Sequence, residues 1–69
     1  MNLFAEKLKE LRKEKRITQV QMAAFLEMTC RNYQRYEAGA AEPNLDGLIK
    51  IADYFGVSLD YLLGRSDER

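Results

Sequence analysis

A chain of 69 residues, 46% hydrophobic and 32% charged, has the length of one small domain and the composition of a globular protein. It has no histidine and one cysteine, so histidine-based catalysis, an internal disulfide and a four-cysteine metal site are excluded, and we expect no enzyme activity, metal or cofactor. The net charge is zero, but residues 1–35 carry a net +4 and residues 36–69 a net −4, which can create one positive face.

The hydrophobic pattern predicts helices only, because no stretch alternates apolar and polar residues for long enough to form a strand. A first helix is predicted over residues 3–14, with apolar side chains at Phe4, Leu8 and Leu11 on one face. Thr18 and Gln21 then form a T-x-x-Q capping box, which predicts a second helix over about 19–26.

Thr29 is the next helix cap and predicts a third helix over about 30–37, which Gly39 ends. Only a three-residue turn separates the second and third helices, and so short a turn makes them cross sharply.

Asn44 caps a fourth predicted helix over about 45–55, and Ser58 caps a short fifth helix over 59–63. Gly47 weakens the fourth helix by about 1 kcal/mol relative to alanine. The polar tail 65–69 is expected to fray. The expected fold is all-α: five helices in a single domain over 1–69, with its core in about 3–64.

Residues 18–39 are the most informative unit, because a capped helix, a short turn and a second capped helix can set that second helix into a DNA major groove. Its exposed positions carry side chains suited to base edges. The predicted base contacts are Cys30, Arg31, Asn32, Gln34 and Arg35. The helix starts at Thr18 and Thr29 are predicted to receive phosphates on their free backbone N–H groups.

The sequence resembles the Cro/CI-type, or Xre-like, helix-turn-helix family of phage repressors and bacterial transcriptional regulators. The resemblance lies in four segments: LKELRKEKRITQ at 8–19, MAAFLEMT at 22–29, YQRYEAG at 33–39 and PNLDGLIKIADYFGVSLDYLLG at 43–64. It implies a five-helix, lambda-repressor-like domain that binds operator DNA, usually as a homodimer on an inverted repeat.

The resemblance also assigns individual residues. Gln19 matches a family glutamine that contacts phosphate and braces the recognition helix, and Arg12 is a further predicted phosphate contact. Glu37 matches an acid that we interpret as structural, with Arg12 as its candidate partner. Independently of the resemblance, an apolar excess near the last two helices predicts either a dimer interface or additional core: Ile51, Tyr54, Tyr61 and Leu62.

Three departures from the family pattern stand out. Arg16 and Glu27 stand where many members have glycine, and if those positions need a positive φ, each costs on the order of 1 kcal/mol. Val20 and Phe25 stand where members more often have polar residues, so they either extend the core or expose apolar surface.

The expected function is therefore that of a cytoplasmic, sequence-specific transcriptional regulator, most simply a repressor, with double-stranded DNA and a second copy as partners. No membrane segment, signal peptide or small-molecule site is indicated. The alternative is an antitoxin-like or adaptor-like protein-interaction module, which an exposed patch at Val20 and Phe25 would favour.

Overall fold

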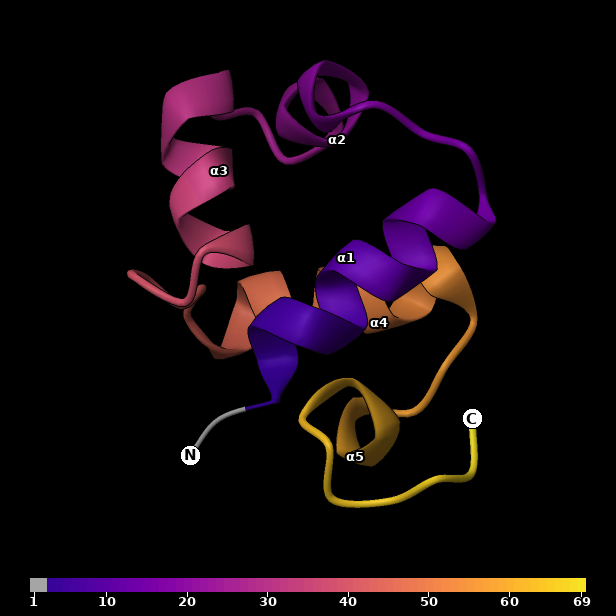
Figure 1. The fold of residues 1–69 in the computed structure, drawn as a ribbon. Coiled ribbons are helices and arrows are strands. Elements are labelled where there is room, and N and C mark those ends of the chain that lie inside the picture. The colour runs from indigo at the N-terminus through magenta and orange to yellow at the C-terminus, as the bar shows by residue number, and fades with distance from the viewer. Residues whose placement is uncertain (1–2) are drawn as a thin grey trace.

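The computed structural model describes residues 3–69, and within them the chain forms five helices and no strand (Figure 1). Met1 and Asn2, which begin the predicted domain, lie outside the described residues. The helices are α1 (Phe4–Glu14), α2 (Gln19–Phe25), α3 (Cys30–Glu37), α4 (Leu45–Phe55) and α5 (Leu59–Leu62). The predicted all-α class is confirmed, and each predicted boundary agrees to within one residue.

The helix starts follow from four side-chain caps. Thr18, Thr29, Asn44 and Ser58 each accept a hydrogen bond from the backbone N–H three residues on, which satisfies one of the free donors of the first turn. At Thr18 the capping box is complete, since the side chain of Gln21 accepts the backbone N–H of Thr18 at 2.8 Å.

Two helices stand at one end of the molecule. Figure 1 shows α2 and α3 at this end, α5 at the opposite end, and α1 and α4 between them. Helix α1 packs against both α3 and α5, and α4 packs against α5. The enclosed core draws on all five helices: Phe4, Leu8, Leu11, Met22, Ala23, Tyr33, Ile51, Ala52, Phe55, Val57, Tyr61 and Leu62. The α2–α3 pair is therefore held on α1 through the contact between α1 and α3.

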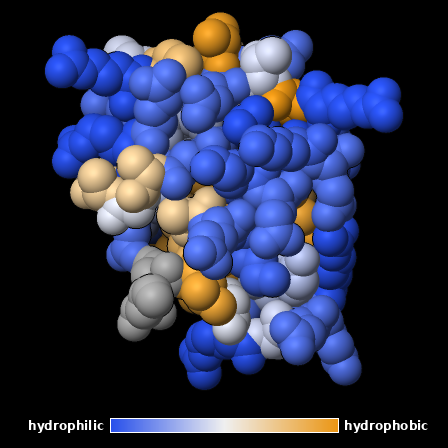
Figure 2. Space-filling view, viewed as in Figure 1, coloured by the Kyte–Doolittle hydropathy of each residue, from blue (hydrophilic) through white to orange (hydrophobic). Residues whose placement is uncertain are grey.

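The surface is mostly polar, and the face in Figure 2 is hydrophilic apart from small separate apolar areas. Among residues 3–69, four large apolar side chains are exposed: Val20, Leu45, Ile49 and Tyr54. Within residues 3–69, none of the helices has both the length and the apolar character that a membrane crossing requires.

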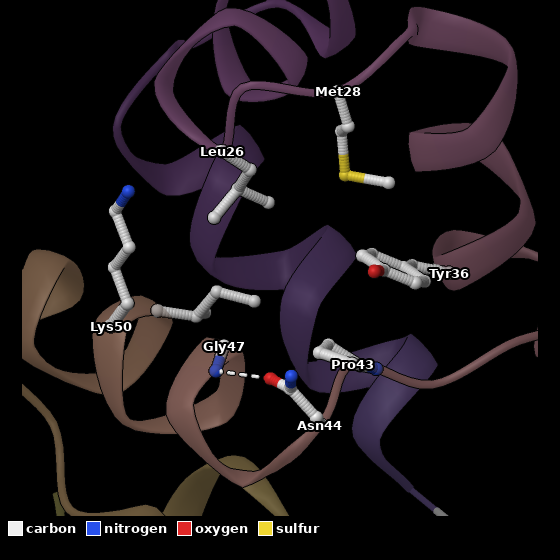
Figure 3. A pocket seen from close by; sticks show the side chains of 8 residues that line it. Leu26, Met28, Tyr36, Pro43, Asn44, Gly47 and Lys50 are labelled. Atoms are coloured by element: carbon white, nitrogen blue, oxygen red, sulfur yellow. Dashed lines mark hydrogen bonds between the residues drawn. The ribbon is translucent and has the colours of Figure 1, made fainter.

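The glycine inside α4 allows a close approach of the preceding loop. A Cβ placed on Gly47 would lie 2.9 Å from the Cβ of Pro43, closer than real Cβ contacts. Here α4 meets the α2–α3 turn around a small hollow of about 220 Å³, with Met28 and Tyr36 on one side and Lys50 on the other (Figure 3). Gly47 therefore leaves room for the loop that leads into α4, which its low helix propensity does not reveal.

The tail that we expected to fray folds back on the domain instead. The guanidinium of Arg69 forms an exposed ion pair with Glu14 of α1 and lies over the ring of Tyr61. The backbone N–H of Ser58 also donates to the carbonyl oxygen of Arg69 at 2.7 Å. The prediction failed because these contacts join residues far apart in the sequence, so no local pattern indicates them.

Candidate nucleic-acid interface

The candidate interface begins with the turn between α2 and α3. Glu27 lies in this turn with a φ of 57°, in the left-handed region that glycine favours, and Arg16, after α1, has a φ of 56°. The condition under which each of these residues costs stability, a positive φ, is therefore met at both positions. The hydroxyl oxygens of Thr18 and Thr29 accept the capping N–H groups, so each hydroxyl keeps its own hydrogen for donation to a phosphate.

Helix α3 divides into a packed face and an exposed face. Tyr33 is fully buried and Glu37 is 8% exposed, whereas the predicted base-contacting residues other than Cys30 are exposed: Arg31, Asn32, Gln34 and Arg35. Cys30 is half-buried and packs against the core. Four of the five predicted side chains are thus free to reach a ligand along the outer face of α3.

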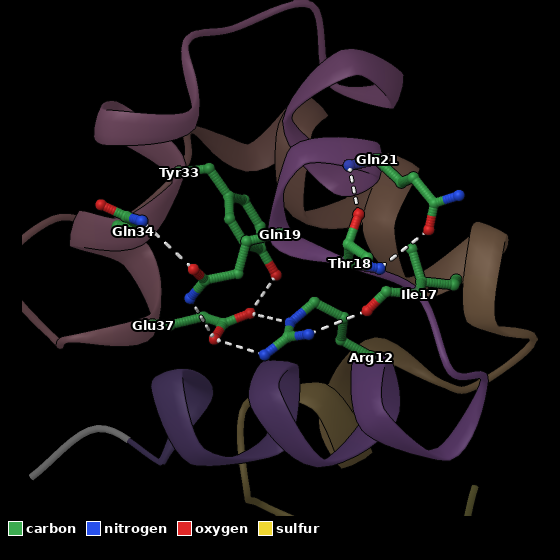
Figure 4. A network of polar contacts seen from close by, with 8 residues as sticks. All are labelled: Arg12, Ile17, Thr18, Gln19, Gln21, Tyr33, Gln34 and Glu37. Atoms are coloured by element: carbon green, nitrogen blue, oxygen red, sulfur yellow. Dashed lines mark hydrogen bonds and ion pairs between the residues drawn. The ribbon is translucent and has the colours of Figure 1, made fainter.

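The carboxylate of Glu37 joins the three N-terminal helices. It accepts hydrogen bonds from Arg12 of α1, Gln19 of α2 and Tyr33 of α3 (Figure 4). The Nε of Arg12 lies 2.5 Å from Glu37 Oε2, and the side chains are 12% and 3% exposed. The predicted Arg12–Glu37 pair is confirmed, and it orients α3 on α1.

The charge state of this cluster follows from its contacts. Burial alone would raise the pKa of Glu37, but the hydrogen bonds from Arg12, Tyr33 and Gln19 outweigh it and hold that pKa below its ordinary value. The hydrogen bond to Glu37 raises the pKa of Arg12. Burial and the hydrogen bond to Glu37 raise the pKa of Tyr33 far above its ordinary range. At neutral pH the cluster is one carboxylate, one guanidinium and one neutral phenol.

The predicted phosphate contact at Arg12 is wrong. Its Nε and Nη2 donate to Glu37, and its Nη1 donates to the carbonyl oxygen of Ile17 at 2.8 Å. With its side chain mostly buried, this guanidinium holds the α1–α2 loop and α3 in place instead of facing a ligand. Gln19, by contrast, remains half-buried at the start of α2.

Sequence reasoning also missed a contact on the exposed face. Gln34 Nε2 donates to Gln19 Oε1 at 3.2 Å, which links α3 to the start of α2. The two residues are 15 positions apart, and nothing in the local pattern pairs them. The Tyr33–Glu37 bond could have been found, because residues four apart share one helix face.

The predicted dimer residues divide between core and surface. Ile51 and Leu62 are fully buried and Tyr61 is 6% exposed, so these three side chains belong to the core and offer no seam to a second copy. Tyr54 is exposed, with its ring centroid 4.3 Å from that of Phe25. The prediction therefore needs correction at three of its four residues.

These features define a helix-turn-helix unit braced on α1, and comparison with known proteins agrees. The family model described as helix-turn-helix matches residues 8–62. The chain belongs to the helix-turn-helix family of the Cro/CI, or Xre-like, type.

Two relatives and one solved structure illustrate this membership. The uncharacterized HTH-type transcriptional regulator YqaE of Bacillus subtilis is 47% identical over 97% of this chain and 59% of its own length. The CTXphi transcriptional repressor RstR of Vibrio cholerae is 40% identical over 87% of this chain and 54% of its own length. The crystal structure of a transcriptional regulator from Listeria innocua superposes with a TM-score of 0.89 and 35% identity, over 100% of this chain and 64% of that one.

The chain thus spans a little over half the length of these two curated relatives.

Proposed function

We propose that this chain is a sequence-specific, DNA-binding transcriptional regulator that inserts α3 into the major groove. The observation that carries the proposal is the outer face of α3. It presents two guanidiniums and two carboxamides, at Arg31, Asn32, Gln34 and Arg35, on a helix whose other face is buried. These are the groups that bond guanine and adenine edges in the major groove. The similarity to RstR favours repression, and a DNA-binding role favours a cytoplasmic location.

The phosphate backbone would be held at the helix starts. The hydroxyls of Thr18 and Thr29 retain a hydrogen to donate, and the first-turn N–H groups of α2 and α3 add further donors. Gln19 stands beside Thr18 and completes this set. These contacts orient the protein on the duplex without reading sequence.

We also propose that two copies bind an inverted repeat as a homodimer. The support for this is the pair of exposed apolar side chains on α4. Leu45 is 62% exposed and Ile49 is 43% exposed, and four residues of spacing put them on one helix face. Pairing of this face with a second copy would remove both side chains from water. It replaces the buried residues Ile51, Tyr61 and Leu62 as the proposed seam.

The protein-interaction alternative receives less support. It depended on a shared patch of Val20 and Phe25, but Phe25 packs on Tyr54, and the ammonium of Lys50 lies 5.0 Å from the centre of its ring. Val20 is the one large apolar side chain that remains exposed on α2, and a single exposed apolar side chain needs no partner.

Sequence selection followed by gel-shift titration tests the proposal. We expect Arg31→Ala and Arg35→Ala each to cost about 1–3 kcal/mol on the selected site and to relax preference at one base position. Arg65→Ala is the matched control, because it removes the same charge after α5, away from α3. Equal losses on selected and random DNA for both α3 variants would contradict base readout.

A further inference from the structure

We propose that the hollow between α4 and the α2–α3 turn is a binding site for a small aromatic carboxylate. The inference stands apart from the proposed function, because none of the side chains proposed to contact DNA lines the hollow. The sequence indicates no small-molecule site, since the lining residues come from segments far apart in the chain: the α2–α3 turn, the end of α3, and α4 with the loop before it.

The size and the walls of the hollow fit one aromatic ring. Its volume is about 220 Å³, whereas an apolar cavity of about 150 Å³ is enough to hold benzene. The difference leaves room for one small substituent on the ring. Leu26, Met28 and Ile51 supply apolar walls, and the thioether of Met28 suits contact with an aromatic ring.

Two hydrogen-bond donors face this space (Figure 3). Asn44 Oδ1 accepts the backbone N–H of Gly47 at 2.9 Å, so the Nδ2 group of Asn44 is left to donate. The hydroxyl of Tyr36 points into the same hollow and has no hydrogen-bond partner among residues 3–69. A ligand that satisfies both groups must offer acceptor atoms.

Lys50 favours an anion as that ligand, because it is the only charged side chain that lines the hollow. Its ammonium lies 5.0 Å from the ring centre of Phe25, a contact that supplies no acceptor oxygen, and it forms no ion pair within the part of the chain that the structure describes. The flexible stem of lysine can turn the ammonium toward a bound anion. A carboxylate on an aromatic ring combines the acceptor oxygens, the charge and the apolar body that the hollow requires.

Titration with benzoate, followed by NMR of the backbone amides, tests the proposal. We expect saturable shifts at Met28, Tyr36 and Lys50, with a Kd on the order of 1 mM for so small a ligand. Nuclear Overhauser effects from the ring protons of benzoate to the methyl group of Met28 should place the ring in the hollow. Benzamide has the same shape without the charge, so we expect it to bind about tenfold more weakly.

Two variants separate the charge from the hydroxyl donor. Lys50→Met removes the ammonium and keeps an apolar stem, so the affinity for benzoate should fall about tenfold while that for benzamide is unchanged. Tyr36→Phe keeps the ring and removes one donor, so it should weaken benzoate severalfold. Lys9→Met, which removes an exposed lysine of α1 outside the hollow, is the matched control and should keep the affinity for benzoate. Thermal unfolding by circular dichroism checks that each variant is folded.

The opposing outcomes are distinct. The site is overturned if benzoate causes no saturable shift, or if the shifts follow the exposed lysines of α1 instead of the hollow. Equal affinities for benzoate and benzamide, or an unchanged affinity in Lys50→Met, would overturn the choice of an anion. If Met28 and Tyr36 shift with protein concentration alone, a second copy fills the hollow and the proposal fails. The DNA-binding proposal is tested separately, by gel shift without benzoate.

Discussion

Arg16 and Glu27 adopt a left-handed backbone although both carry a Cβ. Their φ values of 56° and 57° lie just after α1 and in the α2–α3 turn, where each lets the chain leave a helix. Both side chains are exposed and gain little from burial in return. Both residues therefore hold a backbone that glycine favours, at a cost in stability.

Relief of this strain is the first prediction. Glu27→Gly should stabilise the domain by about 1 kcal/mol, because glycine adopts a positive φ without the Cβ clash. For a domain of this size that corresponds to a rise in Tm of roughly 4–8 °C. Glu27→Ala is the control, since it removes the charge and keeps the Cβ; a similar gain from alanine would assign the effect to charge.

Glu37 gives the domain an acid-sensitive stability. Its folded pKa is lowered relative to the unfolded chain, so its contribution is complete above the unfolded pKa of about 4.3 and is lost as the pH falls through the folded value. We expect Tm to fall as the pH drops below about 4.3, with the loss centred on the buried cluster.

Carboxyl titration by NMR checks this directly, because it reports the folded pKa of Glu37 without a substitution. Glu14→Gln is the control for surface charge, since the Glu14–Arg69 pair is half-exposed and screened by solvent. This variant should keep the acid dependence of Tm. A titration of Glu37 at or above its ordinary pKa would contradict the network.

At the scale of elements, the helices were predictable because their signals are local. Each cap lies directly before its helix, and Gly39, Gly56 and Gly64 have the positive φ that ends a helix. Which apolar residues are buried was less predictable. Helix α4 is apolar on more than one face, so periodicity alone could not show that Ile51 is enclosed while Leu45 and Ile49 are exposed.

The candidate site also has a part that the sequence predicts and a part that it does not. The exposed residues of α3 followed from the helical period of one short segment. The bonds from Gln19 to Glu37 and from Gln34 to Gln19 did not, because they depend on the angle between two helices. Arg12 faces inward because α3 packs against α1 and brings Glu37 to it, which the composition of α1 could not reveal.

Gly47 gives a prediction in which propensity and packing disagree. Helix propensity alone predicts that Gly47→Ala stabilises α4 by about 1 kcal/mol. The added Cβ would press on the Cβ of Pro43 at 2.9 Å, so we expect Gly47→Ala to lower Tm. In a Pro43→Gly background the contact is absent, and the same substitution should raise Tm relative to that background. Thermal unfolding of the four proteins measures both effects.

At the scale of the whole molecule, the net positive charge and the proposed dimer seam lie on different parts of the chain. The first 35 residues carry the net positive charge and include α1, α2 and nearly all of α3. The exposed pair Leu45 and Ile49 lies on α4, in the acidic half. The proposed DNA contacts and the proposed dimer seam therefore use separate segments, so one can be altered without the other.

This separation leads to the last prediction. Ile49→Glu should abolish self-association in sedimentation experiments and weaken binding to a two-half-site operator, while the protein stays folded because Ile49 is 43% exposed. Binding to a single half-site should be unaffected. Half-sites should be centred about 10 base pairs apart. Glu42→Lys, on an exposed loop, is the control; an unchanged mass for Ile49→Glu would exclude this seam.

The position of Arg12 has a consequence for protein engineering. Residues 18–39 contain the helix caps Thr18 and Thr29, the turn and the outward-facing side chains of α3, so this segment looks as if it could be moved into another protein. Yet the guanidinium that neutralises Glu37 comes from α1, outside that segment. If residues 18–39 alone were moved into another protein, the carboxylate of Glu37 would lie at the contact with that protein without its arginine partner. Loss of one partner from a buried pair costs about 3–5 kcal/mol. Successful grafting therefore requires a host helix that supplies an arginine at the matching place.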